Sequence, residues 1–174
     1  MREDVVQLLD ELETRLQDRG VRLHVQIVGG AALLLHNLVD RATADIDARY
    51  ESADVVDAVV AEMARDYGLP DRWLNNRAVA FLPDEMSWMA SLGSSSAIRL
   101  ADLKSLAAMK LAAERQKDIE DLGQIARALG IDDPEKLVDI AYAKYGEHSS
   151  ALAGERENYL IVAEEAILAG LHRP

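Results

Sequence analysis

The stretch Ile27-Val28-Gly29-Gly30-Ala31-Ala32, followed after an apolar segment by Thr43-Ala44-Asp45-Ile46-Asp47-Ala48, decides how the first half of this chain folds. The pattern predicts a strand that enters a diglycine turn, a short helix, and a second strand. Because successive strand side chains point to opposite faces, we expect both aspartates to project to one side while the isoleucine between them points into the core. Paired carboxylates suit Mg²⁺, which prefers oxygen ligands, and glycines let backbone amides approach a phosphate. The stretch therefore predicts a site for a metal-bound nucleoside triphosphate.

The rest of the chain divides into strands before residue 101 and helices after it. Hydrophobic periodicity and turn residues predict helices at 5–16, 31–38 and 53–67, and strands at 24–28, 45–50, 77–82, 86–92 and 97–100. From residue 101 onward the pattern is helical, with breaks near Gly130 and around residues 146–149. We expect an α/β (α+β) core over residues 1–100, with a small mixed sheet flanked by helices. A helical C-terminal region, residues 101–174, is expected to pack on it in a single compact unit.

Composition limits the class of protein. The chain has 174 residues, 49% of them apolar, which is enough for one buried domain. It contains no cysteine, so disulfides, thiolate zinc sites and cysteine nucleophiles are excluded. No apolar run reaches the length of a membrane span, and the N-terminal MREDVVQLLDEL is charged and amphipathic. We expect a cytoplasmic protein with no membrane partner.

Charge is unevenly distributed. The formal net charge of −12 argues against a general nucleic-acid coat protein. Residues 97–117 nevertheless carry five basic side chains against two acidic ones, a local charge of +3. Such a strip fits a triphosphate or an RNA backbone, and it equally fits a solvated helix surface.

The run VGGAALLLHNLVDRATADIDARY, residues 28–50, resembles the nucleotidyltransferase superfamily, whose signature is a Gly-Gly or Gly-Ser turn followed by Asp-x-Asp. A second run, LADLKSLAAMKLAAERQKDIEDL, residues 100–122, is similar to the C-terminal motif of the AbiEii and MenT-like branch. That branch contains toxins of bacterial toxin–antitoxin systems. Together the two motifs imply a nucleotidyltransferase-like fold.

The resemblance implies roles for the residues of the first motif. Asp45 and Asp47 would bind Mg²⁺ or Mn²⁺, and the backbone amides of Gly29, Gly30 and Ala31 would cradle the triphosphate of an NTP substrate. Two further residues precede the acidic pair. Thr43 is expected to brace the entry to the strand, and Arg41 either reaches a phosphate or pairs with a nearby aspartate.

The second motif lies on one helix or on two in succession. If it is helical throughout, Lys110, Asp118 and Asp121 fall on one face. The resemblance implies that Lys110 contacts the triphosphate and that Asp118 lies beside the nucleophile or metal, with Arg115 and Asp121 as secondary candidates. A surface ladder of ion pairs would give the same spacing.

One element of many related transferases is missing from the sequence. A third carboxylate usually lies on a later strand, and the expected strands at 77–82 and 97–100 contain none. Asp118 or Asp121 would have to replace it. The segment Asn75-Asn76-Arg77 either lines the nucleotide cleft or forms a turn. The four histidines show no metal-ligand spacing.

The expected function is Mg²⁺-dependent transfer of a nucleoside monophosphate to an acceptor hydroxyl, on a tRNA 3′ end or a protein. The resemblance also implies a toxin role with a cognate antitoxin as partner. Two alternatives stay open: an inactive nucleotidyltransferase-fold protein that binds nucleotide or a partner, and a transferase acting on a small molecule of the aminoglycoside type.

Overall fold

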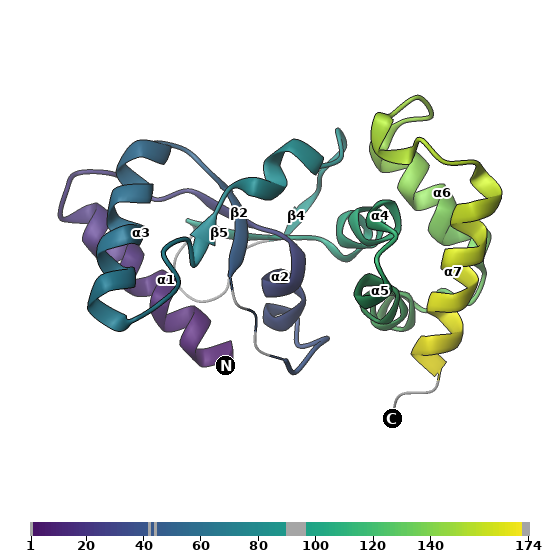
Figure 1. Cartoon of the computed structure of the whole chain (residues 1–174), viewed down its shortest axis with the longest axis horizontal. Coiled ribbons are helices and arrows are strands. Elements are labelled where there is room, and N and C mark those ends of the chain that lie inside the picture. Colours follow the sequence, from purple (N-terminus) through teal and green to yellow (C-terminus); the bar gives the residue numbers. More distant parts are fainter. Residues whose placement is uncertain (1, 42, 44, 90–96, 172–174) are drawn as a thin grey trace. The chain divides into compact units, whose positions relative to one another are not determined.

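The computed structural model describes residues 2–41, 43, 45–89 and 97–171. The chain forms two compact units (Figure 1). The first comprises Met1–Ala80 and Trp88–Leu100, and the second comprises Phe81–Ser87 and Ala101–Pro174. Within the described ranges, no helix combines the length and the apolar character needed to span a membrane.

A five-stranded mixed sheet organises the first unit, in the order β3-β2-β1-β5-β4. Strand β1 pairs antiparallel with β2 and parallel with β5, and β2 pairs parallel with β3. The strands are β1 (Val25–Ile27), β2 (Ile46–Tyr50), β3 (Leu74–Asn75), β4 (Trp88–Met89) and β5 (Ile98–Ala101). This mixed sheet with its flanking helices confirms the predicted fold class, a nucleotidyltransferase-like α/β arrangement.

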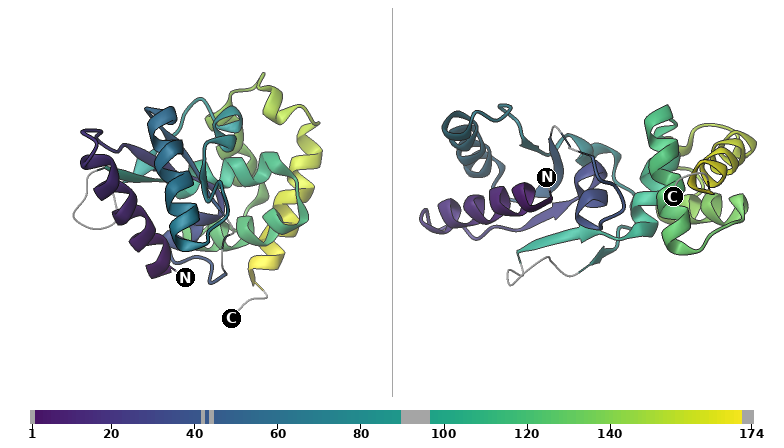
Figure 2. Two further views of the ribbon diagram at one scale, coloured as in Figure 1. Left: turned by 60° about the vertical axis from the view of Figure 1, so that its left-hand side comes forward. Right: turned by 90° about the horizontal axis from the view of Figure 1, so that it is seen from below.

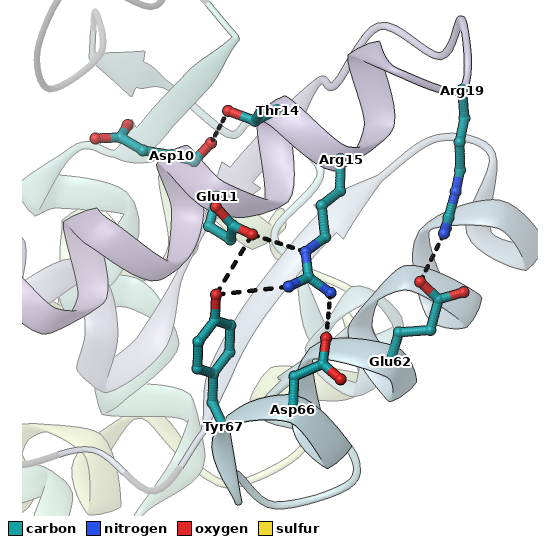
Figure 3. A network of polar contacts seen from close by, with 8 residues as sticks. All are labelled: Asp10, Glu11, Thr14, Arg15, Arg19, Glu62, Asp66 and Tyr67. Carbon is teal, nitrogen blue, oxygen red and sulfur yellow. Dashed lines mark hydrogen bonds and ion pairs between the residues drawn. The ribbon is translucent and has the colours of Figure 1, made fainter.

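Helices α1 (Arg2–Gln17) and α3 (Ala53–Tyr67) lie side by side in the first unit (Figure 2). Apolar residues of both are buried, and ion pairs join their polar sides (Figure 3). The Arg15 guanidinium bonds to Glu11 at 2.8 Å and to Asp66 at 2.7 Å, and Arg19 bonds to Glu62 at 2.6 Å. Solvent reaches these pairs, so each contributes at most about 1 kcal/mol. The apolar contacts beneath them hold α1 on α3.

Helix α2 (Gly29–Leu35) begins at the diglycine, two residues before the expected start. Its apolar residues from Ala31 to Leu35 are at most 3% exposed, as the sequence predicts for a buried helix. The predicted helix at 53–67 agrees with α3, which ends at Gly68 in the left-handed conformation. Part of the strand expected at 86–92 is β4, and residues 90–92 lie outside the described residues.

The prediction of a strand at residues 77–82 is wrong. Residues Arg77–Phe81 form a 3₁₀ helix, and the strand lies earlier, as β3. The side chain of Asn75 explains the difference, because its Oδ1 accepts a hydrogen bond from the Arg77 N–H at 3.0 Å. Such a local asparagine bond turns the backbone and ends the strand.

Helices make up most of the second unit: α4 (Leu103–Ala113), α5 (Gln116–Leu129), α6 (Pro134–Tyr145) and α7 (Arg156–Leu171), with a 3₁₀ turn at Ser150–Leu152. Helix α5 approaches α7 closely at two glycines. A Cβ atom on Gly123 would lie 2.4 Å from the Ala166 carbonyl oxygen, and one on Gly170 would lie 2.6 Å from the Gly123 oxygen. The two backbones can pack at this distance because neither residue has a side chain.

Candidate functional site

The acidic pair lies at the start of β2. Asp45 occupies the bend just before the strand, and Asp47 is its second residue, so the strand begins one residue later than expected. Ile46 between them is 3% exposed, whereas both aspartates are partly exposed. The strand therefore presents two carboxylates beside a buried anchor, as the alternation of strand side chains predicts.

The diglycine turn lies against this pair. The Val28 N–H donates a hydrogen bond to the Asp47 carbonyl oxygen at 2.9 Å, which extends the pairing of β1 with β2. Gly29 has φ of +64°, and a Cβ atom placed there would lie 3.3 Å from Asp47 Oδ2. Glycine is thus favoured at this position both by backbone conformation and by the nearby carboxylate. The structure brings together the two halves of the first motif.

Thr43 braces the entry to the strand, as expected. Its hydroxyl donates to the Asp45 carbonyl oxygen at 2.6 Å, and its Oγ1 lies 3.8 Å from where a Cβ atom on Gly30 would stand. Arg41 is exposed in the preceding turn. Ala31 is buried in the first turn of α2.

Asn75 joins this group from the neighbouring strand. It pairs in register with Asp47, is 4% exposed, and its Nδ2 lies 3.5 Å from Asp45 Oδ2, at the long limit of a hydrogen bond. The sequence left open whether Asn75 lines the cleft or forms a turn, and it did not indicate that Asn75 lies on a strand, because the strand was expected to begin three residues later, at Arg77. The signal available was the apolar Trp73-Leu74 pair that directly precedes it.

An open hollow of about 410 Å³ borders Asp45. It is lined by Asp45, Pro70, Asp71, Arg72 and Arg77. Both arginines are exposed and, within the described part of the chain, neither makes an ion pair. The hollow can therefore admit an anionic group next to the acidic pair.

The donor set at Asp45 and Asp47 fits a magnesium ion that a substrate completes. Among the described residues, no group of three or more acidic, histidine or cysteine side chains converges to enclose a metal. Magnesium rarely uses such an enclosure, and it is commonly held by one or two carboxylates, waters and substrate phosphates. Two adjacent carboxylates beside a glycine turn match that requirement.

The residues of the second motif gather in the second unit. The Lys110 ammonium on α4 pairs with Asp118 and, at 2.8 Å, with Asp121, both on α5. The Arg115 side chain, 60% exposed, also pairs with Asp118. Lys110 is 8% exposed, and each aspartate is 1% exposed.

This cluster is electrically balanced, because two cations face two carboxylates. A buried charge is tolerated only when it is paired, so the pairing accounts for the burial of Lys110 without any ligand. Glu114 has φ of +49° and separates α4 from α5, which shows two helices in succession and not one. The structure thus brings Lys110, Asp118 and Asp121 together in one unit, and Asp45, Asp47 and Gly29 together in the other.

Comparison with models of protein families shows the family to which this chain belongs. A family model described as "Nucleotidyltransferase of unknown function (DUF6036)" matches residues 3–159. The chain belongs to the DUF6036 family. The description of this family supports membership of the nucleotidyltransferase superfamily, as the sequence resemblance indicated. Comparisons with curated proteins and with solved structures returned no match.

Proposed function

We propose that this DUF6036 protein is a Mg²⁺-dependent nucleotidyltransferase that moves a nucleoside monophosphate from an NTP to an acceptor hydroxyl. The observation that carries the proposal is the contact between the diglycine turn and the acidic strand. A Cβ atom at Gly29 would lie 3.3 Å from Asp47 Oδ2, so the glycine keeps space free beside this carboxylate. A glycine turn beside two carboxylates suits a ligand that carries both phosphates and a divalent metal.

In this proposal Asp45 and Asp47 hold the metal, with Mn²⁺ as a substitute for Mg²⁺. When bound, the metal supplies positive charge to the phosphate oxygens that gather negative charge during transfer. The backbone N–H groups of Gly29, Gly30 and Ala31 bind the triphosphate. Val28, the residue that precedes α2, has an apolar side chain and does not accept hydrogen bonds from the first N–H groups of the helix, as a serine or an aspartate at that position would.

The proposed transfer step forms one bond to phosphorus and breaks another. The acceptor oxygen forms a bond to the α-phosphorus, the bond from that phosphorus to the bridging oxygen breaks, and pyrophosphate leaves. The acceptor proton passes to a base, for which we propose Asp118, with Asp121 as a secondary candidate.

Lys110 is proposed to neutralise the triphosphate, with Arg115 assisting. An ammonium has three N–H donors, and Asp118 and Asp121 engage two of them. A triphosphate role would therefore use the third donor or displace a carboxylate. Lys110 also orients both aspartates, so its loss affects the proposed base as well.

The biological role is proposed from the second motif. Its resemblance to the AbiEii and MenT-like branch supports a toxin with a cognate antitoxin, and a tRNA 3′ end or a protein hydroxyl as acceptor. A fold can carry many activities, so the acceptor is identified by a transfer assay that offers both total tRNA and total protein.

A second candidate is a nucleotide-binding protein that transfers nothing. Asn75, which is not a carboxylate, stands opposite Asp47 on β3. An amide does not deprotonate an acceptor hydroxyl. The charge balance around Lys110 favours this candidate too, because a neutral cluster attracts a triphosphate weakly.

One experiment separates the two candidates. The protein is incubated with Mg²⁺ and each α-labelled NTP, with and without total tRNA or total protein, and label transfer is measured beside nucleotide binding. Asp47→Asn should lower transfer by at least ~100-fold through loss of a metal ligand. Asp10→Asn, an exposed change on α1, serves as the control and should leave transfer unaltered.

Nucleotide binding without transfer to any acceptor would favour the binding protein. Transfer that persists in Asp47→Asn would remove the acidic pair from the mechanism. If neither binding nor transfer occurs, both candidates fail.

A further inference from the structure

A row of polar side chains crosses the sheet one step from the acidic pair. Gln26 on β1 pairs in register with Arg49 on β2 and with Arg99 on β5. The neighbours of Gln26 on β1, Val25 and Ile27, are fully buried on the other face. Residues in register share a face, and so do residues two apart in a strand. The row therefore lies on the same face of the sheet as Asp47.

Arg49 is held in this row by neutral groups. Its Nε donates to Gln26 Oε1 at 2.6 Å, and its guanidinium lies 5.3 Å from the centre of the Trp88 ring. Hydrogen bonding to an amide and stacking on an indole fix the orientation of a guanidinium without cancelling its charge. The Arg49 side chain is exposed, so its charge faces solvent.

Three arginines that do form ion pairs are arranged differently. Arg15, Arg19 and Arg156 each bond to one or two carboxylates. Arg49 and Arg99 form no ion pair with any described residue, although the chain carries a net charge of −12. Two uncompensated arginines on one sheet face, one of them held in a fixed orientation, are suited to binding phosphate groups.

The position of the row indicates which phosphates it would bind. The diglycine turn, proposed above for the triphosphate, meets β2 at Asp47, while the row meets β2 at Arg49. Two strand residues span about 7 Å, roughly the rise of two stacked nucleotides at ~3.4 Å each. A strand of nucleic acid bound by the row could thus end at the acidic pair.

We propose that Arg49, Gln26 and Arg99, with Trp88, bind the phosphodiester backbone of a single-stranded polynucleotide, whose terminal hydroxyl is the acceptor. The inference rests on the proposed function and specifies its acceptor. Gln26 and Trp88 are positioning residues in it, because they act through Arg49. Trp88 also offers an aromatic surface of the kind on which bases stack.

The test uses a short fluorescent single-stranded RNA with a free 3′ hydroxyl, measured by anisotropy at several salt concentrations. The variant Arg49→Gln/Arg99→Gln is expected to bind RNA at least ~10-fold more weakly. The slope of log affinity against log salt should fall by about 1.4, since two phosphate contacts on a single strand are lost at ~0.7 each. Arg99→Gln alone leaves the Gln26 and Trp88 contacts of Arg49 intact, and it should lower the slope by about half as much.

The control is Arg22→Gln/Arg65→Gln, which removes the same charge from exposed residues of the first unit outside the row. It should change RNA affinity by less than about twofold. Binding of Mg²⁺ with each labelled NTP is measured in parallel, and the row variants should leave it unchanged within about twofold.

Three results would overturn the inference: no RNA binding by the wild-type protein, equal loss in the row and control variants, or a loss of NTP binding as large as the loss of RNA binding. The last result would assign the row to the triphosphate. Absence of Mg²⁺–NTP binding by the wild-type protein would instead count against the proposed function, while RNA binding through the row could still be measured.

Discussion

Replacing Lys110 by methionine should strongly destabilise the second unit. The substitution keeps a long, helix-favouring side chain but removes the ammonium that pairs with Asp118 and Asp121. Both aspartates are 1% exposed, so their charges stay buried after the ammonium is lost. Removing one partner of a buried ion pair costs about 3–5 kcal/mol, whereas an exposed pair is worth at most about 1 kcal/mol. Arg115 still neutralises Asp118, which places the expected loss near ~3 kcal/mol.

Urea unfolding followed by far-ultraviolet circular dichroism measures this loss. With a urea slope of roughly 2 kcal/mol per molar, a loss of ~3 kcal/mol lowers the midpoint by about 1.5 M. Trp73 and Trp88 both belong to the first unit, so tryptophan fluorescence followed in the same titration reports on that unit. The dichroism transition should move further than the fluorescence transition.

A control and a second variant make the result interpretable. Lys104→Met makes the same chemical change at an exposed position of α4, and it should shift stability by no more than about 0.5 kcal/mol. Adding Asp121→Asn to Lys110→Met removes one stranded charge and should restore part of the loss. Equal midpoints for Lys110→Met and Lys104→Met would refute the reasoning, since they would mean that the buried cluster does not depend on its ammonium.

Two further predictions concern the second unit. Gly123→Ala places a Cβ atom 2.4 Å from the Ala166 carbonyl oxygen, and overpacking of this kind should destabilise the protein by about 1–3 kcal/mol; an unchanged melting temperature would show that α5 and α7 separate freely. Burial raises the pKa of Tyr145 to about 12, so the folded state favours the neutral phenol. The resulting contribution to the free energy of unfolding is complete below pH ~10 and is lost as the pH rises towards 12. Tyr145→Phe loses the 2.7 Å hydrogen bond to the Phe81 carbonyl, worth about 1 kcal/mol at neutral pH, but its stability should fall less between pH 10 and 12 than that of the wild type; parallel pH curves would contradict this assignment.

Local signals predicted the elements around the first motif. The apolar residues of α3 recur at helical spacing and are followed by Gly68, and both boundaries of that helix agree with the structure. The contact of Gly29 with Asp47 could be anticipated because one short helix separates two strands that pair directly. In these cases propensity, periodicity and turn chemistry all favour the same structure.

Other features depend on interactions that periodicity does not carry. The short apolar run that ends at Pro83 predicts a strand at 77–82, but the Asn75 side chain bonds to the Arg77 backbone and a 3₁₀ helix forms. Glu114 ends α4 in a left-handed conformation with no glycine to signal it. The helical spacing of Lys110 and Asp118 predicts one face of a helix, either in a site or in a surface ladder, yet the two side chains meet between separate helices in a buried cluster. Sequence spacing alone does not distinguish a solvated ladder from such a cluster.

The two candidate sites differ in how far their charged side chains are paired with opposite charges of the protein itself. In the second unit, Lys110 and Arg115 are matched by two carboxylates, so the arrangement is stable without a ligand. In the first unit, the Asp45 carboxylate faces the amide of Asn75, and the Arg49 guanidinium contacts the amide of Gln26 and the indole of Trp88. Neutral groups orient these charges and leave their fields intact, which is the arrangement expected where a ligand supplies the opposite charge. A divalent metal at the acidic pair and phosphates along the arginine row would satisfy both, so the polar face of the sheet is the part of the molecule in which substrate contacts should be sought first.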